Sequence, residues 1–382
     1  MKRIRVLISF ALVITCLAGA FCRCLAEDDI PLVILDTDMG VFNDDAMALS
    51  LLLKAEEAGM LRVIGITLEG GNNFIDADYI NYGEVQPAET KNITDLLALI
   101  GREDIPVYRG TDYPAGTGPS DTGMLSAFYE SLPYLQANSG YGAVHFYENL
   151  SSGALADSND ARDFLLSCAK EYPGRVTVIA IGPVMNLARA AEADSSFASN
   201  IAAVYYMAGA FGAPCEAFFT SGEPVQAVGG ANITPWAEYN ACYDALSLST
   251  CVTAGFPVQV FMPGEVNAPI GTGEVKRIEE ANAGRGGIAA LWLDRYASVL
   301  PGYPYWDPLT VTAFLKAENL RGKTSYVTIV TDRADPFYAM TTALTEEEYA
   351  LLEDAQKERY GKAFVAEGYD DFWDVAIELL CK

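Results

Sequence analysis

The chain has 382 residues, of which 51 are acidic and 25 basic, so its formal net charge at pH 7 is −26. A chain this acidic repels nucleic acid and phosphorylated metabolites unless a local basic groove attracts them. Lys and Arg form no cluster of that kind along the sequence. The composition therefore excludes a nucleic-acid partner and favours a neutral small molecule, a cation or a metal ion.

Residues 1–26 have the pattern of a secretory leader. Basic residues near the start precede an apolar or small stretch from Val6 to Ala20, and a small-x-small cleavage site ends at Ala26. The apolar stretch is short for a membrane span, and no second long one follows. We expect an exported protein (secreted, periplasmic or on the cell surface) without stable membrane insertion after leader removal. An uncleaved leader that tethers the chain to a membrane is the alternative.

Short apolar runs alternate with helical patterns from residue 31 onward. The expected strands are Leu32–Leu35, Arg62–Leu68, Ile105–Tyr108, Val176–Ile181, Ile201–Met207 and Pro257–Met262. The expected helices are Asp45–Ala58, Asp160–Glu171, one that starts with Val184–Ala191, and two in the tail from Thr345 to Lys382. This alternation predicts an α/β fold with an open, mostly parallel sheet and helices on both faces. No linker or repeat divides residues 27–382, which predicts a single domain, and the irregular stretch 110–153 is expected to be a lid or a surface excursion.

Cysteines beyond the leader are widely spaced and form no CxxC pair, which disfavours a zinc site of thiolates. They are Cys168, Cys215, Cys242, Cys251 and Cys381. We expect buried free thiols. One or two disulfides in an oxidising compartment are the alternative.

The segment Pro31–Leu53 contains four aspartates where an apolar run meets a helical pattern: Asp36, Asp38, Asp44 and Asp45. In open α/β sheets, ligands bind at the end of the strand where such a transition occurs. Four carboxylates in ten residues repel one another unless a cation lies among them, and a hard divalent cation such as Ca²⁺ suits oxygen ligands. Helix capping by Asp44 or Asp45 explains one or two of these residues but not all four.

Polar residues also follow the later strands, in the runs Glu69–Asn73, Gly182–Pro183, Asn232–Asn240 and Tyr303–Leu309. Each run has an ordinary alternative. Gly-Asn pairs are commonly turns, Glu238 could cap a helix, and Trp306-Asp307-Pro308 could be an Asp cap followed by Pro at the first helical position.

Taken together and in this order, the motifs resemble the inosine–uridine (nucleoside) hydrolase family. The aspartate segment reads DTDMGVFNDDAMAL, with two extra residues before the paired aspartates. It is followed by Gly71-Asn72, IGPVMNLA at 181–188, NITPWAEYN at 232–240 and WDPL at 306–309. The resemblance runs from about residue 31 to about residue 320. It implies a Rossmann-like nucleoside hydrolase fold and Ca²⁺-dependent hydrolysis of the N-glycosidic bond of ribonucleosides.

The resemblance implies a role for each matching position. The implied calcium ligands are Asp38, Asp45, Asp307 and the main-chain carbonyl of Ile181, and Asp38 is also the implied general base. The implied contacts to the ribose 2′- and 3′-hydroxyls are Asp44, Asn72 and Asn240. The implied contacts to the 5′-hydroxyl are Asn232 and Glu238, with Asp36 as a support behind the site. Hydroxyl-reading side chains of this kind discriminate strongly against deoxy sugars.

The chain departs from the family on the leaving-group side. The family often has a histidine immediately before the late aspartate, but here that residue is Trp306, and the single histidine, His145, lies elsewhere. A histidine general acid at that position is therefore excluded. Family members with tryptophan there favour purines by stacking, so Trp306 indicates a purine-preferring pocket that it would form with Tyr303, Tyr305 or Trp236. His145 would reach the leaving group only if residues 110–153 fold over the pocket, and a surface or packing role is the alternative.

Two other functions stay open on the sequence alone. The same site could cleave another N-riboside, such as nicotinamide riboside, or the chain could be a non-catalytic exported protein that binds a nucleoside or sugar. Family members are commonly homo-oligomers, although an exported relative with altered surfaces need not follow them.

Overall fold

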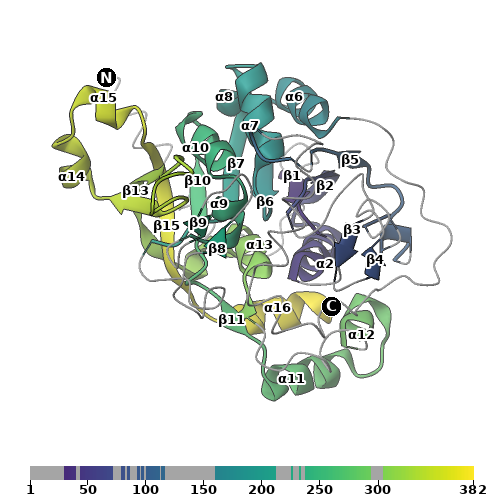
Figure 1. The fold of residues 1–382 in the computed structure, drawn as a ribbon. Helices are drawn as coiled ribbons and strands as arrows, with labels where there is room; N and C mark the ends of the chain where they lie inside the picture. Colours follow the sequence, from purple (N-terminus) through teal and green to yellow (C-terminus); the bar gives the residue numbers. More distant parts are fainter. Residues whose placement is uncertain are drawn as a thin grey trace, which may run out of the picture.

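A nine-stranded mixed sheet organises the part of the chain that the structure describes (Figure 1). This computed structural model describes residues 30–39, 44–71, 79–81, 84–86, 93–94, 96–98, 100–111, 113–116, 160–211, 225–226, 232–233, 237–293 and 304–382. The strand order is β14-β13-β15-β10-β7-β6-β1-β2-β5. The strands are β1 (Leu32–Thr37), β2 (Arg62–Leu68), β5 (Val107–Arg109), β6 (Val176–Ala180), β7 (Ile201–Met207), β10 (Gln259–Met262), β13 (Leu320–Ile329), β14 (Thr341–Leu344) and β15 (Gly361–Tyr369).

Every pairing from β15 to β5 is parallel, and β13 runs antiparallel to both of its neighbours. The expected open, mostly parallel α/β sheet is thus confirmed. Short antiparallel strand pairs accompany it: β3 (Tyr79–Asn81) with β4 (Glu84–Gln86), β8 (Val225–Gln226) with β9 (Asn232–Ile233), and β11 (Ala268–Pro269) with β12 (Pro304–Tyr305).

Helices cover both faces of the sheet, as Figure 1 shows. One layer contains α2 (Asp44–Glu57), α11 (Thr272–Asn282), α12 (Gly287–Trp292), α13 (Asp307–Leu315) and α16 (Phe372–Leu380). The other contains α6 (Ala161–Glu171), α7 (Met185–Ala193), α8 (Phe197–Asn200), α9 (Tyr239–Tyr243) and α10 (Ala245–Thr253). Strand β1 packs against both layers, because Val33 and Leu35 face the α2 side while Leu32 and Ile34 face the α7 side. Burial on both faces explains its uninterrupted apolar sequence.

The tail is more β-rich than expected. The first of its two expected helices is divided into α14 (Glu346–Ala350) and α15 (Asp354–Lys357), which bury no residue, whereas the second is observed as α16. Leu351, between α14 and α15, is 86% exposed, and the segment packs through Tyr349, which stacks on Tyr326 of β13. With so little apolar surface buried, one long helix here would be marginal in water. Strand β15 lies between these helices, and η6 (Ala317–Asn319) leads into its partner β13.

No helix among the described residues is long and apolar enough to cross a membrane. The expected leader lies outside the described residues, and so does the stretch 117–150, which holds His145 and most of the expected lid. The leader, the lid and the single-domain interpretation stay predictions.

The chain order places a ligand site at one point of the sheet. From β1 the chain continues to β2 and β5 on one side, and it then crosses to β6, β7 and β10 on the other side. Neighbouring strands β1 and β6 therefore flank the topological switch point, where the crevice beyond the carboxyl ends of the strands can accept a ligand. Asp38 and Ile181 are the residues directly beyond this edge.

Candidate active site

Four buried carboxylates lie at the carboxyl end of β1 and on the two helices beside it. Asp38 follows β1, Asp44 and Asp45 form the start of α2, and Asp307 is the first residue of α13. None is more than 5% exposed. One oxygen from each of Asp44, Asp45 and Asp307 lies within 4.8 Å of the others. Asp38 is outside this trio, but its charge acts on Asp307.

Local contacts hold the trio in place. The Thr37 hydroxyl donates a hydrogen bond of 2.5 Å to Asp45 Oδ1, and the Trp306 amide donates one of 3.2 Å to Asp44 Oδ2. The first contact joins β1 to α2, and the second joins the start of α13 to α2. Pro308 stands within the first turn of α13, where the missing N–H costs no helical bond. The helix cap is Trp306 and not Asp307, so the capping alternative does not account for Asp307.

The electrostatics of this cluster favour a cation. The pKa of Asp307 is raised well above its usual value, first by burial and then by the charges of Asp44, Asp45 and Asp38. Ionised carboxylates gathered in a buried place destabilise one another, and a positive ion among them reverses the effect. The donors are hard oxygens, which fits the ligand preference of Ca²⁺. Asp44, whose implied role is to contact the ribose, lies in the same group as the two implied ion ligands Asp45 and Asp307.

Two glycines allow backbone to approach Asp38 closely. A Cβ atom on Gly71 would lie 2.0 Å from Asp38 Oδ2, and one on Gly182 would lie 3.0 Å from the Asp38 amide nitrogen. Ile181, the residue before Gly182, donates its N–H to the Asp36 carbonyl across 2.8 Å. The ends of β2 and β6 are thus packed against Asp38 on both sides.

Asn240 and Glu238 lie at the start of α9 and are engaged with backbone groups. Asn240 Nδ2 donates to the carbonyls of Ile181 and Met207, each across 3.0 Å. The Glu238 carboxylate accepts the N–H groups of Asn240, Ala241 and Gly209 at 2.9 to 3.0 Å. Glu238 therefore caps α9, as the alternative interpretation of this run anticipated. Burial raises the pKa of Glu238 to about 7.

Trp306 is buried, with 4% of its surface exposed, and its indole N–H donates to the Gly264 carbonyl across 2.8 Å. Tyr305 is fully buried and packs edge-on against Trp373 at a centroid distance of 5.5 Å. The other aromatic candidates, Tyr303 and Trp236, lie outside the described residues, as does Asn72. Asn232 lies in β9, but its side chain is not described. The roles assigned to these residues stay predictions.

A polar network lies behind the carboxylates, and of its members only Asp36 was given a role from the sequence. Asp36 Oδ1 accepts from Thr67 Oγ1 at 2.5 Å and from Asn186 Nδ2 at 2.9 Å. Burial raises the pKa of Asp36 to about 6, and these two hydrogen bonds oppose the increase. Glu69 is also buried and accepts N–H groups from the start of α7. The position of Asp36 agrees with its expected role as a support behind the site. The sequence indicated no role for Glu69, which stands in the run Glu69–Asn73, or for Asn186, which stands in the IGPVMNLA motif.

Cys168, Cys242, Cys251 and Cys381 are free thiols, and the first three are buried. The expectation of buried free thiols is confirmed for these three, whereas Cys381 is free but only partly buried, and Cys215 lies outside the described part of the chain. Burial raises the pKa of the Cys168 thiol to about 12. Thiols of this kind are protonated and unreactive at neutral pH.

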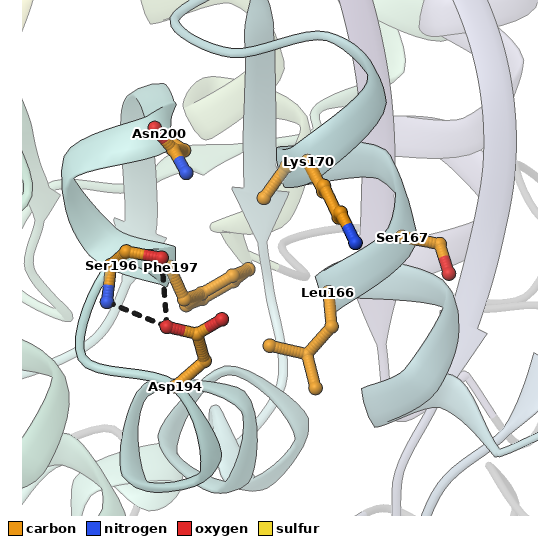
Figure 2. A pocket seen from close by; sticks show the side chains of 8 residues that line it. Leu166, Ser167, Lys170, Asp194, Ser196, Phe197 and Asn200 are labelled. Carbon is orange, nitrogen blue, oxygen red and sulfur yellow. Dashed lines mark hydrogen bonds between the residues drawn. The ribbon is translucent and has the colours of Figure 1, made fainter.

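A separate pocket of about 320 Å³ lies between α6 and α8, lined by residues that include Lys170, Asp194 and Ser196 (Figure 2). Asp194 accepts hydrogen bonds from the Ser196 amide and hydroxyl at 2.8 and 2.7 Å. The pocket includes Asn200, which immediately precedes β7, so it lies toward the amino ends of the strands. The carboxylates lie at the opposite, carboxyl ends, and the pocket contains none of the expected site residues.

An open α/β sheet with buried carboxylates at its switch point is typical of the class of α/β enzymes that bind a small molecule there. Within that class, residues 33–373 match the family model described as inosine-uridine preferring nucleoside hydrolase. The chain therefore belongs to this family, whose members hydrolyse N-glycosidic bonds of nucleosides.

Proteins of similar sequence are named as nucleosidases or ribonucleoside hydrolases. A probable uridine nucleosidase 2 of Arabidopsis thaliana is 31% identical over 231 residues, which cover 60% of this chain and 58% of that protein. The pyrimidine-specific ribonucleoside hydrolase RihA of Salmonella arizonae is 26% identical over 302 residues, or 75% of this chain and 80% of the relative. The alignment thus spans little more than half of the plant protein's length.

Solved structures share the fold. A plant nucleoside hydrolase superposes with a TM-score of 0.66 at 24% identity, over 92% of this chain and 99% of the other. A purine-preferring ribonucleoside hydrolase from Gardnerella vaginalis gives 0.66 at 22% identity, over 92% and 98%.

Proposed function

We propose that this enzyme hydrolyses the N-glycosidic bond of ribonucleosides to ribose and free base, and that the reaction depends on Ca²⁺. The observation that carries the proposal is the buried group of Asp44, Asp45 and Asp307 at the switch point of the sheet. Asp38 is close enough for its charge to raise the pKa of Asp307. Family membership supports the bond that is cleaved.

The residues proposed to hold the ion are Asp38, Asp45, Asp307 and the carbonyl of Ile181. The carboxylates are buried and mutually repulsive, which favours a divalent cation, and their hard oxygens favour calcium among such ions. When bound, a cation of this kind lowers the pKa of a water molecule and orients it toward the sugar.

Asp38 is proposed to accept the proton of the attacking water. The Gly71 backbone packs closely against this carboxylate, and Gly182 packs against the amide nitrogen and Cβ atom of Asp38, which restricts movement of the side chain. Bond cleavage passes through a transition state with positive charge on the ribose ring, which nearby carboxylates stabilise. Direct attack by water on one face of the ring inverts the anomeric centre.

Ribose recognition is proposed for Asp44, Asn72, Asn240, Asn232 and Glu238. The start of α9 holds Asn240 and Glu238 through backbone contacts, so these side chains lose little rotational freedom when substrate arrives. A buried polar group without its hydroxyl partner is costly, and ribonucleosides should therefore be preferred over deoxyribonucleosides.

The base preference is a separate question. Trp306 is the basis for expecting purines, whereas the named relatives include uridine and pyrimidine hydrolases. The buried indole, with its N–H bound to Gly264, has little surface free for stacking in this conformation. We therefore propose ribonucleosides as the substrate class and keep purine preference as a prediction for the substrate panel.

The test is a reducing-sugar assay on inosine, guanosine, adenosine, uridine, cytidine and nicotinamide riboside, each with Ca²⁺ and with a strong chelator. Ribose release that the chelator abolishes and Ca²⁺ restores supports the proposal. Cleavage of nicotinamide riboside alone supports the alternative substrate, and binding of a nucleoside without ribose release from any compound supports the non-catalytic alternative.

A further inference from the structure

Glu69 caps a helix that is distant from it in the sequence. Its side chain is fully buried, and its carboxylate accepts the Val184 N–H across 2.6 Å and the Asn186 N–H across 3.1 Å. The Met185 N–H also donates to it. Val184, the N-cap residue of α7, has a left-handed φ of 61° and offers no side-chain cap of its own. A carboxylate at the end of β2 thus satisfies the free N–H groups at the start of α7.

The same residue is bound to the end of β1. The Glu69 amide donates to the Thr37 carbonyl across 3.1 Å. Gly182 lies between Glu69 and Asp38, because a Cβ atom there would lie 2.7 Å from Glu69 Oε1 and 3.0 Å from the Asp38 amide nitrogen. The peptide that contains the Ile181 carbonyl is therefore packed between the Glu69 carboxylate and the backbone of Asp38.

A cap for α7 does not require a buried glutamate. Helix starts are commonly capped by Ser, Thr, Asn or Asp at the N-cap position itself, and a buried carboxylate close to Asp36 is costly, since burial and the Asp36 charge both disfavour its ionised form. What Glu69 adds is a connection between three strand ends, those of β1, β2 and β6. Two of the residues beyond these ends, Asp38 and Ile181, are proposed ligands of the ion.

We infer that Glu69 is a positioning residue, which holds the Ile181 carbonyl and the Asp38 backbone in the relative position that the metal ion requires. The inference rests on the proposed function, because it concerns the ligands of the proposed ion. Outer residues that orient metal ligands typically change metal affinity by about 10–100-fold when they are replaced.

Two variants separate position from charge. Glu69→Asp keeps the carboxylate but shortens the side chain by one methylene, so it cannot reach the start of α7 in the same geometry. Glu69→Gln keeps the length but removes the charge and places an NH₂ group against backbone donors. The control is Asp160→Ala, which removes the carboxylate that caps α6 in the same helical layer through the Arg162 N–H at 2.9 Å.

Calcium affinity of the chelator-stripped full chain is measured by isothermal titration calorimetry, and its melting temperature is measured without metal. We expect both Glu69 variants to raise the Kd for Ca²⁺ about tenfold or more, while Asp160→Ala, which removes a helix cap, lowers the melting temperature and leaves that Kd unchanged. Wild-type Kd values in both Glu69 variants would show that Glu69 only caps α7 and does not position the metal ligands. A raised Kd in Glu69→Gln alone would identify a charge effect and overturn positioning.

The wild-type protein separates the two proposals. If it binds Ca²⁺ but releases ribose from no riboside, the proposed function fails, and the comparison of Kd values still decides the role of Glu69. If it hydrolyses nucleosides without binding Ca²⁺, the inference about Glu69 is overturned. If it binds Ca²⁺ and hydrolyses nucleosides while the Glu69 variants bind as tightly, only the inference fails.

Discussion

The hydroxyl of Thr37 donates a hydrogen bond of 2.5 Å to Asp45 Oδ1, and this contact joins the last residue of β1 to the first turn of α2. The same hydroxyl oxygen accepts the Met39 N–H across 3.2 Å. One buried side chain thus orients a proposed metal ligand and supports the turn that carries Asp38.

Replacement of this hydroxyl should weaken metal binding. We expect Thr37→Val to raise the Kd for Ca²⁺ about tenfold and to lower the free energy of unfolding by about 1–3 kcal/mol, because it removes two buried hydrogen bonds. Thr310→Val is a matched control. Thr310 is equally buried, and its Oγ1 has no hydrogen-bond partner among the described residues. Loss of this hydroxyl should therefore weaken neither Ca²⁺ binding nor stability. Equal effects of the two variants on Kd would contradict the role of Thr37.

The proposed base has a direct test. Asp38→Asn should reduce kcat by about 10²–10⁴-fold, because an amide cannot accept the proton of water. The side chain is 1% exposed and nearly isosteric with asparagine, so far-UV circular dichroism should be unchanged. Steady-state kinetics at saturating Ca²⁺ separate this effect from loss of metal, and a variant with wild-type kcat would exclude Asp38 as the base.

Close packing at Gly71 predicts strong sensitivity to a single methyl group. Gly71→Ala would place Cβ 2.0 Å from Asp38 Oδ2, so the carboxylate must move, and kcat/KM should fall by about 10²-fold. Gly273→Ala in α11 is the control, since a Cβ there meets nothing within 4 Å. It should stabilise the protein by up to about 1 kcal/mol because alanine favours helix. Retained kcat/KM in Gly71→Ala would show that the loop adapts and that Asp38 is not held by it.

Removal of one carboxylate from the trio should affect the free energy of unfolding in opposite directions with and without metal. Asp307→Asn relieves repulsion from Asp44 and Asp45, so in chelator the variant should be at least as stable as wild type. With Ca²⁺ at 100 times its Kd, wild type should gain about 2.7 kcal/mol, and the variant should gain much less. Urea denaturation in both conditions provides the measurement. An equal gain in the two proteins would remove Asp307 from the metal site.

The pKa of Glu238 predicts a pH dependence of stability. Burial raises this pKa from 4.5 to about 7, so the folded state binds a proton more tightly than the unfolded state. The contribution of Glu238 to stability is then fully present below pH 4.5 and is lost as pH rises through about 7. The difference in free energy of unfolding between wild type and Glu238→Gln should fall across this interval by up to about 3 kcal/mol. A difference that is constant with pH would mean that Glu238 titrates normally.

Much of the fold could be predicted from local patterns. The apolar runs of β1, β2, β6, β7 and β10 and the helical periods of α2, α6 and α7 involve contiguous residues, and alternation of the two indicates a parallel sheet. The sheet edge formed by β13, β14 and β15 was missed because pairing there joins distant segments, and β15 alternates buried and exposed residues without a strong apolar run.

By itself, the sequence determined that an acidic group lies where β1 meets α2, since those aspartates are close along the chain. The family resemblance already implied Asp307 as a distant partner of Asp38 and Asp45, but only the tertiary structure decided the contacts that distant residues make there. Asp307 meets Asp44 and Asp45, the Trp306 amide reaches Asp44 across 262 positions, and Glu69 caps α7 across 115. Such contacts depend on how helices and strand ends pack, and residue spacing contains no record of that packing. For the same reason, Glu69 in its turn motif and Trp306 beside Asp307 could be recognised from the sequence, but the groups that they contact could not.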